Sequence, residues 1–133
     1  AFNSALIGTV DKAYIADKFG VATDSGFIFT SDVLGMKTKE FNALLKAVFK
    51  DAYEKTVKKK QVRAGKGKSR GRKYKSNAGL LFVIGNNESM KRKGVDVVSV
   101  NDLRIANLAP NGRPGRFACF TEQAIKDIGE TFK

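Results

Sequence analysis

Apolar side chains recur along much of the chain with the period of an α-helix. The clearest case covers residues 41–52, whose apolar positions fall on one face of an amphipathic helix, with Thr38 as a suitable N-terminal cap. A weaker pattern of small and apolar residues begins at Phe2, and Gly8 and Thr9 indicate a division in its middle. Both stretches predict helices that bury one face.

Short β-prone runs alternate with these helical patterns. They lie at residues 27–30, 80–84, 95–100 and 116–120. A final helix is predicted to start at Thr121 and to bury a stripe of Ala124, Ile125, Ile128 and Phe132. Strands that alternate with helices predict an α/β domain of three layers.

The run at residues 80–84 is apolar at every position, which is typical of a strand covered by helices on both faces of a parallel sheet. The connection that follows it, residues 86–94, is barely long enough for a helix, because parallel connections usually need about a dozen residues. With 133 residues and 42% apolar side chains, the chain suits one domain, residues 1–133, and leaves no room for a second.

Almost all of the excess charge belongs to one segment of the chain. The sequence has 25 Lys and Arg against 13 Asp and Glu, a net charge of +12. Without the cations of residues 55–75, 14 basic side chains remain against 13 acids, and no acid occurs between Glu54 and Glu88. The eleven cations of this segment are Lys55, Lys58, Lys59, Lys60, Arg63, Lys66, Lys68, Arg70, Arg72, Lys73 and Lys75.

Residues 59–78 have the composition of a nucleic-acid-binding loop. They contain almost no apolar side chains, so we expect an extended loop that follows the surface and stays disordered until RNA orders it. The interspersed glycines let the backbone approach phosphates, which Arg contacts with its fork and Lys with a point charge. Tyr74 is placed to stack on an unpaired base. A solvated charge run and a nuclear targeting signal are the competing interpretations, and composition does not separate RNA from DNA.

A second basic stretch, residues 110–116, is rich in turn-forming residues and presents Arg113 and Arg116. Judged by itself, a plain surface loop is as good an interpretation as an RNA contact. No apolar run reaches the length of a membrane span, and the N-terminus lacks the pattern of a secretion signal, so we expect a cytoplasmic protein without a membrane partner.

The chain offers little for catalysis. It has no histidine, and the apolar neighbours of its one cysteine, Cys119, indicate a buried strand position rather than a nucleophile or a zinc ligand. The string Gly67-Lys68-Ser69 imitates the end of a phosphate-binding loop, but Val62 stands where that loop needs its first glycine. We therefore expect no catalytic residue, no cofactor, no metal and no small-molecule substrate.

Four stretches of the sequence together resemble one known family. They are SALIGTVDKAYIADKFG at 4–20, RAGKGKSRGRKY at 63–74, GVDVVSV at 94–100 and LAPNGRPGRFACFTEQAI at 108–125. They are similar to the C-terminal part of the universal large-subunit ribosomal protein number four, in its archaeal and eukaryotic form. The resemblance covers essentially the whole chain.

This resemblance implies a three-layer α/β/α fold around a four-stranded, mainly parallel sheet that carries the basic extended loop. It also implies binding to large-subunit ribosomal RNA, contact with neighbouring large-subunit ribosomal proteins, a place in the cytoplasmic ribosome and no enzymatic activity. From charge and resemblance together, the expected RNA-binding residues are Lys58, Lys60, Arg63, Lys66, Lys68, Arg70, Arg72, Lys73, Tyr74, Lys75, Arg113 and Arg116.

Some positions depart from the family pattern. Asn111, Gly112 and Arg113 replace two glycines and a histidine, so Arg113 is a weaker match than Arg116, and Ser69 replaces a methionine. The family's N-terminal segment and its long extended loop have no counterpart in this sequence, and we expect a fragment or a reduced version of the family protein. Two other classes remain as alternatives: a small Rossmann-like nucleotide-binding or RNA-modifying enzyme, and a DNA-compacting protein.

Overall fold

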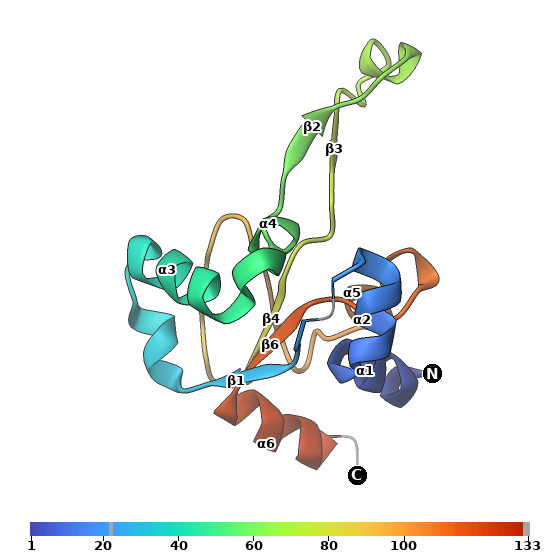
Figure 1. Cartoon of the computed structure of the whole chain (residues 1–133). Helices are drawn as coiled ribbons and strands as arrows, with labels where there is room; N and C mark the ends of the chain where they lie inside the picture. The colour runs from blue at the N-terminus through green and yellow to red at the C-terminus, as the bar shows by residue number, and fades with distance from the viewer. Residues whose placement is uncertain (22, 132–133) are drawn as a thin grey trace.

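Four parallel strands form the central sheet of the computed structural model, which describes residues 1–21 and 23–131. Across the sheet they are β1 (Phe27–Phe29), β6 (Ala118–Thr121), β4 (Leu81–Ile84) and β5 (Asp96–Ser99) (Figure 1). The inner strand β4 pairs in parallel with both β5 and β6. This sheet confirms the predicted α/β class and the four predicted strands.

Side chains of β4 point alternately into two cores, one on each face of the sheet. Phe82 and Ile84 belong to one core, Leu81 and Val83 belong to the other, and none of the four is more than 5% exposed. The strand is apolar at every position because neither face of the sheet meets water.

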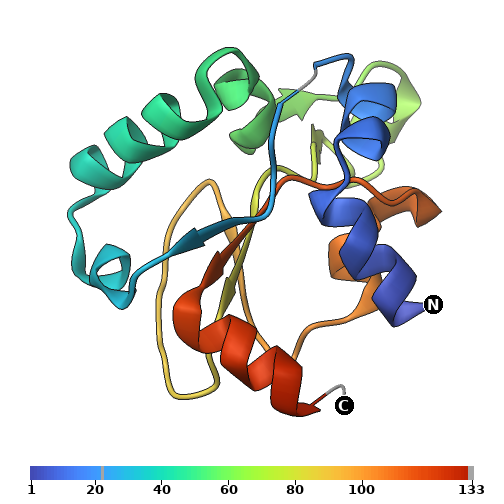
Figure 2. The ribbon, with the colours of Figure 1, turned by 60° about the horizontal axis from the view of Figure 1, so that its bottom comes forward.

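Helix α3 (Thr38–Phe49) covers the first face of the sheet, and its buried side chains Phe41, Leu45 and Phe49 recur every four residues. The connection from residue 86 to residue 94 contains no helix, and its Met90 side chain is buried in the same core. Figure 2 shows this connection as an extended loop near α3. The sequence left a helix in this short connection in doubt, and the structure shows none there.

Three helices cover the second face, namely α1 (Phe2–Val10), α5 (Ile105–Leu108) and α6 (Glu122–Thr131). Each contributes at least one side chain to the second core, and these include Ala5, Leu108 and Ala124. The sheet with helices on both faces is the expected three-layer arrangement (Figure 2). Within residues 1–21 and 23–131, no helix is long and apolar enough to cross a membrane.

The first helical pattern is divided at Asp11, not at Gly8 and Thr9 as predicted. The Asp11 carboxylate accepts a hydrogen bond from the backbone N–H of Ala13 (2.8 Å) and so caps α2 (Lys12–Phe19). Gly8 lies inside α1. A Cβ at this position would lie 2.5 Å from the Cβ of Pro114, so the position requires glycine. The glycine thus permits a close approach between segments and does not break the helix.

The predicted cap of α3 is wrong. Thr38 is the first helical residue, and the cap position belongs to Lys37. The backbone N–H of Lys37 donates to the carboxylate of Glu40 (3.3 Å). An acid in the first turn also suits the partial positive charge at a helix N-terminus. The start of α3 is therefore stabilised by Glu40 and not by the threonine hydroxyl.

The predicted start of α6 is confirmed, because the hydroxyl of Thr121 accepts a hydrogen bond from the backbone N–H of Ala124 (3.1 Å). Its predicted buried stripe is only partly right. Ile128 packs against the second core, but the Ile125 side chain is 41% exposed. Phe132 lies outside the described residues.

Candidate nucleic-acid interface

The basic segment forms a two-stranded hairpin that projects from the body of the molecule (Figure 1). Strand β2 (Lys60–Val62) pairs antiparallel with β3 (Tyr74–Ser76), and Val62 lies opposite Tyr74. The expectation of an extended loop that follows the surface was therefore wrong, because the two halves of the segment pair as strands. The two halves of the segment satisfy each other's backbone hydrogen bonds, and such pairing needs no apolar core.

The tip of the hairpin is a single turn, η3 (Lys66–Lys68), between two glycines with left-handed backbone. The φ angles of Gly65 and Gly71 are +82° and +76°, a region that L side chains rarely adopt. The backbone N–H of Arg72 donates to the carbonyl of Gly67 (3.1 Å) and closes the turn. The glycines thus allow the reversal of the chain.

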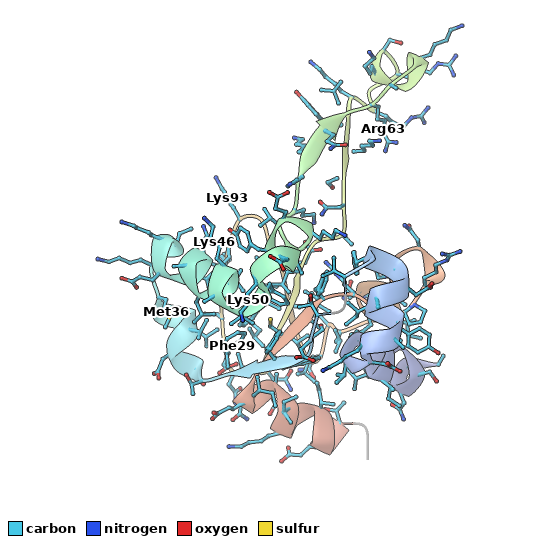
Figure 3. All side chains as sticks on the ribbon, in the orientation of Figure 1. Phe29, Met36, Lys46, Lys50, Arg63 and Lys93 are labelled. Atoms are coloured by element: carbon cyan, nitrogen blue, oxygen red, sulfur yellow. The ribbon has the colours of Figure 1, made fainter. Side chains whose placement is uncertain are left out.

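All eleven cations of the segment are exposed, and Figure 3 shows side chains along both strands and around the tip. In the part of the chain that the structure describes, only two of them have an acidic partner: Lys58 with Asp96 (2.6 Å) and Lys59 with Glu54 (3.4 Å). The hairpin therefore carries a large positive charge that the protein does not neutralise. The nine without an acidic partner are Lys55, Lys60, Arg63, Lys66, Lys68, Arg70, Arg72, Lys73 and Lys75.

Tyr74 lies among these cations. The ammonium groups of Lys60 and Lys73 are 4.3 Å and 5.6 Å from the centroid of its ring, within the range of cation–π attraction. The side chain is 47% exposed. The arrangement offers a base a surface for stacking and offers its phosphate nearby positive charge.

Asn77 fixes the point where the hairpin leaves the body. Its side-chain oxygen accepts a hydrogen bond from the backbone N–H of Lys59 (2.7 Å), and its amide donates to the carbonyl of Val57 (3.1 Å). Close by, Gly79 has a φ of +66°, and a Cβ there would lie 3.1 Å from the carbonyl oxygen of Thr56. These contacts join the hairpin to the body as a braced element and not as a free linker.

Arg116, one of the predicted RNA contacts, is buried and only 3% exposed. Its guanidinium donates one hydrogen bond to the carboxylate of Asp96 (2.5 Å). It also donates to the backbone carbonyls of Ala78 (2.6 Å), Gly79 (3.0 Å) and Asn107 (2.8 Å). The prediction for Arg116 is therefore wrong, because a guanidinium enclosed by these acceptors has no surface left for a phosphate.

The carboxylate of Asp96 lies between two cations, Lys58 and Arg116. Partial burial by itself would raise the pKa of this carboxyl. The hydrogen bonds and positive charges of the two cations outweigh burial and hold the pKa below its usual value. The three side chains form a charged network under the base of the hairpin.

The second basic loop lies beside the end of α2. Arg113 is exposed at its surface, and its backbone carbonyl accepts a hydrogen bond from the ammonium group of Lys18 (2.9 Å). Burial lowers the pKa of Lys18, and the nearby charges of Arg116 and Arg113 lower it further. Positive groups are therefore crowded at this point.

Sequence reasoning did not identify Asn77, Asp96 or Lys18. Asp96 could have been identified, because it is a carboxylate in a β-prone, apolar run and a charge in a buried strand needs a partner. Asn77 and Lys18 had no such signal, since their partners Lys59 and Arg113 lie 18 and 95 residues away along the chain.

Cys119 lies in β6 and is fully buried, as the sequence predicted. Burial raises the pKa of its thiol far above the usual range, so the thiol stays protonated and unreactive. Its role is to fill space in the first core.

No family model matches the chain. Curated archaeal proteins named large ribosomal subunit protein uL4 do match it. The protein of Saccharolobus solfataricus is 37% identical over 138 residues, which cover 96% of this chain and 52% of the relative. The protein of Haloarcula marismortui is 34% identical over 136 residues (98% and 55%), and that of Thermoplasma acidophilum is 45% identical over 100 residues (71% and 39%). The chain thus spans about half the length of the curated relatives it matches.

Proposed function

This chain belongs to the family of large ribosomal subunit protein uL4, and from that membership we propose that it is a structural constituent of the large ribosomal subunit that binds ribosomal RNA through its basic hairpin. The observation that carries the proposal is the projecting hairpin, in which eight exposed cations lack an acidic partner among the described residues. The names of the relatives support a structural, non-enzymatic role. The proposal includes a cytoplasmic, ribosomal location and contacts with neighbouring large-subunit proteins.

In this proposal, residues 1–133 form one domain, and residues 59–78 of that domain contact the RNA. A double-stranded RNA helix has a deep, narrow major groove, so a basic ribbon contacts it mainly through phosphates. Cations along both strands and around the tip suit a position between RNA segments that approach from several sides. The proposed contacts are Lys58, Lys60, Arg63, Lys66, Lys68, Arg70, Arg72, Lys73, Tyr74, Lys75 and Arg113.

The salt dependence of RNA affinity tests this proposal. Binding of the protein to a fragment of large-subunit ribosomal RNA is measured by filter binding between 50 and 300 mM KCl. Because each neutralised phosphate adds about 0.7 to 0.9 to the slope of log affinity against log salt, the double substitution Arg70→Ala and Arg72→Ala should reduce the slope by about 1.4 to 1.8.

The matched control is the double substitution Lys39→Ala and Lys126→Ala, which also removes two exposed cations but from α3 and α6. It should leave the slope within about 0.3 of the original value. Equal slopes for the hairpin variant and the unaltered protein would exclude the hairpin as the RNA-binding element. Equal affinity for duplex DNA and the ribosomal RNA fragment would favour a general polyanion binder instead.

A further inference from the structure

The base of the hairpin is hollowed where it faces the end of α2. Two adjoining cavities, of about 480 Å³ and 270 Å³, are both lined by Phe19, Lys55 and Asn77. The two cavities lie on either side of these three residues, and we call them together the basal groove. Its volume is in the range of sites that hold small organic groups.

The basal groove lies between two basic parts of the chain. The short helix α4 (Tyr53–Thr56), which precedes the hairpin, contributes Lys55, the end of the hairpin contributes Asn77, and the second basic loop contributes Pro110 and Asn111. Lys18 at the end of α2 completes the smaller cavity. The two basic stretches of the sequence therefore meet at one site in the folded protein.

The smaller cavity is lined by three cations, Lys18, Lys55 and Arg116, and by no acid, whereas the larger cavity also includes the exposed Glu54. The ammonium group of Lys18 donates to the carbonyl of Arg113, and that of Lys55 donates to the carbonyl of Phe19. A carbonyl carries only a partial charge, and neither lysine has an acidic partner among residues 1–21 and 23–131, so both retain further N–H donors for an anion. Burial lowers the pKa of Lys18, and the charges of Arg116 and Arg113 lower it further, so a negative group placed nearby would offset this repulsion.

The groove also has an aromatic wall. The ring of Phe19 stacks on Phe117, with 4.5 Å between the centroids, and this contact holds its orientation. Phe19 is half-buried and lines both cavities, and the ammonium group of Lys18 lies 5.9 Å from the centroid of its ring. An oriented aromatic ring beside uncompensated lysines is the combination that binds unstacked bases and their phosphates.

We infer that the basal groove binds one unpaired nucleotide of ribosomal RNA, with its base against Phe19 and its phosphate near Lys18 and Lys55. A base that is stacked and paired in a helix has no free face to offer Phe19, so the nucleotide has to be unpaired. This inference rests on the proposed function, since the hairpin has to bring the RNA to the site. It adds a preference for a bulged or single-stranded nucleotide to the sequence-independent attraction of the hairpin.

The test compares two RNA duplexes that differ in one unpaired 2-aminopurine bulge. Their affinities for the protein are measured at 150 mM KCl by fluorescence anisotropy, and the emission of the 2-aminopurine reports its stacking. Because stacking of one base on an aromatic side chain changes affinity substantially, we expect roughly tenfold tighter binding of the bulged duplex and a change in emission. Phe19→Leu should reduce the preference to less than about twofold and leave the affinity for the paired duplex unchanged.

Tyr14→Leu is the matched control, because Tyr14 is a half-exposed aromatic on the same helix that does not line the groove. It should keep the tenfold preference. If Phe19→Leu lowers the melting temperature enough to prevent the comparison, the double substitution Lys18→Gln and Lys55→Gln replaces it and should abolish the preference equally.

The outcomes separate the two proposals. Equal affinity of the unaltered protein for both duplexes, or a preference that survives the groove substitutions, overturns the basal groove but leaves the hairpin as the RNA-binding element. No affinity for either duplex or for the ribosomal RNA fragment overturns the proposed function and the groove together.

Discussion

Replacing Arg116 by methionine removes a buried guanidinium but keeps most of the aliphatic volume of the side chain. In the native protein this group donates four hydrogen bonds, one of them to the carboxylate of Asp96. The Arg116 side chain is only 4% exposed, so water does not replace these bonds in the variant. The carbonyls of Ala78 and Gly79, where the hairpin joins the sheet, lose the donor that ties them to Asn107.

The expected loss in the free energy of unfolding is about 3 to 5 kcal/mol, because three backbone carbonyls lose their donor and a buried acceptor left unsatisfied costs about 1 to 3 kcal/mol. Hydrogen bonds to a charged group are worth roughly 1.5 to 3 kcal/mol each, but bonds that share one guanidinium are not additive. Asp96 is 34% exposed and keeps Lys58 at 2.6 Å, so its charge is not left bare. In a chain of this size, about 1 kcal/mol lowers the melting temperature by roughly 3 to 4 °C, and we expect a fall of about 10 to 20 °C.

Thermal unfolding followed by circular dichroism measures this effect. Arg113→Met is the matched control, because Arg113 comes from the same loop but is exposed, and its removal should change stability by less than about 0.5 kcal/mol. RNA binding at 10 °C gives a second readout. Arg116→Met should leave the slope of affinity against salt unchanged, because its guanidinium does not face solvent.

The opposite pair of results would refute the structural role of Arg116. If Arg116→Met melted at the temperature of the unaltered protein and reduced the salt slope by about one phosphate contact, Arg116 would be an RNA-binding residue after all.

Two further predictions concern the same region. The pKa of Asp96 is lower in the folded chain than its ordinary value of 3.8, so its carboxylate adds stability above that pH, and this contribution is lost as the pH falls through the folded-state pKa. Asp96→Asn should therefore be less stable than the unaltered protein at pH 7, and urea unfolding should show the gap narrowing towards pH 3; a constant gap would contradict the assignment. Replacing residues 63–73 by an Asn-Gly turn removes six cations, none of them buried, and should change the melting temperature by less than about 2 °C. The same variant should bind the ribosomal RNA fragment at least tenfold more weakly in filter binding, and a large fall in melting temperature would show that the hairpin supports the fold.

The sheet and its main helix could be predicted because their signals are local. The run that became β4 is apolar at every position, and this alone indicated two covered faces. Helix α3 has an uninterrupted stripe at helical spacing, and its burial followed from that stripe. The ends of the helices were less predictable, because Asp11 and Glu40 compete as caps with equally suitable neighbours.

The basic hairpin was predicted as a segment but not as a structure. Its charge and glycines predicted that residues 55–75 bind a polyanion, and this remains a proposal. Composition rules that assign disorder to polar segments do not anticipate pairing between β2 and β3, because both faces of such a ribbon meet water and give no hydrophobic alternation.

Arg116 shows the limit of charge as a guide to binding. In the sequence it resembles Arg113, three residues earlier in the same turn-rich loop. The two differ only in tertiary surroundings, since Asp96 and the carbonyls of Ala78 and Gly79 are brought to Arg116 from 20 to 38 residues away. No local pattern distinguishes a buried arginine that donates to backbone carbonyls from an arginine that is exposed to solvent.

The basic side chains from Lys58 to the tip of the hairpin differ in how freely they can bind a phosphate. A phosphate that approaches Lys58 has to compete with Asp96 at 2.6 Å, and displacing that carboxylate would also weaken its pair with the buried Arg116. Lys59 meets only an exposed acid, Glu54, at 3.4 Å, which is a weak competitor. Beyond this base, within the described residues, no acid lies within ion-pair distance of the hairpin cations, so each phosphate contact there releases counter-ions without breaking an internal pair. Each cation near the tip should therefore contribute more to RNA affinity than a cation at the base. The base should serve mainly to fix the direction in which the hairpin projects.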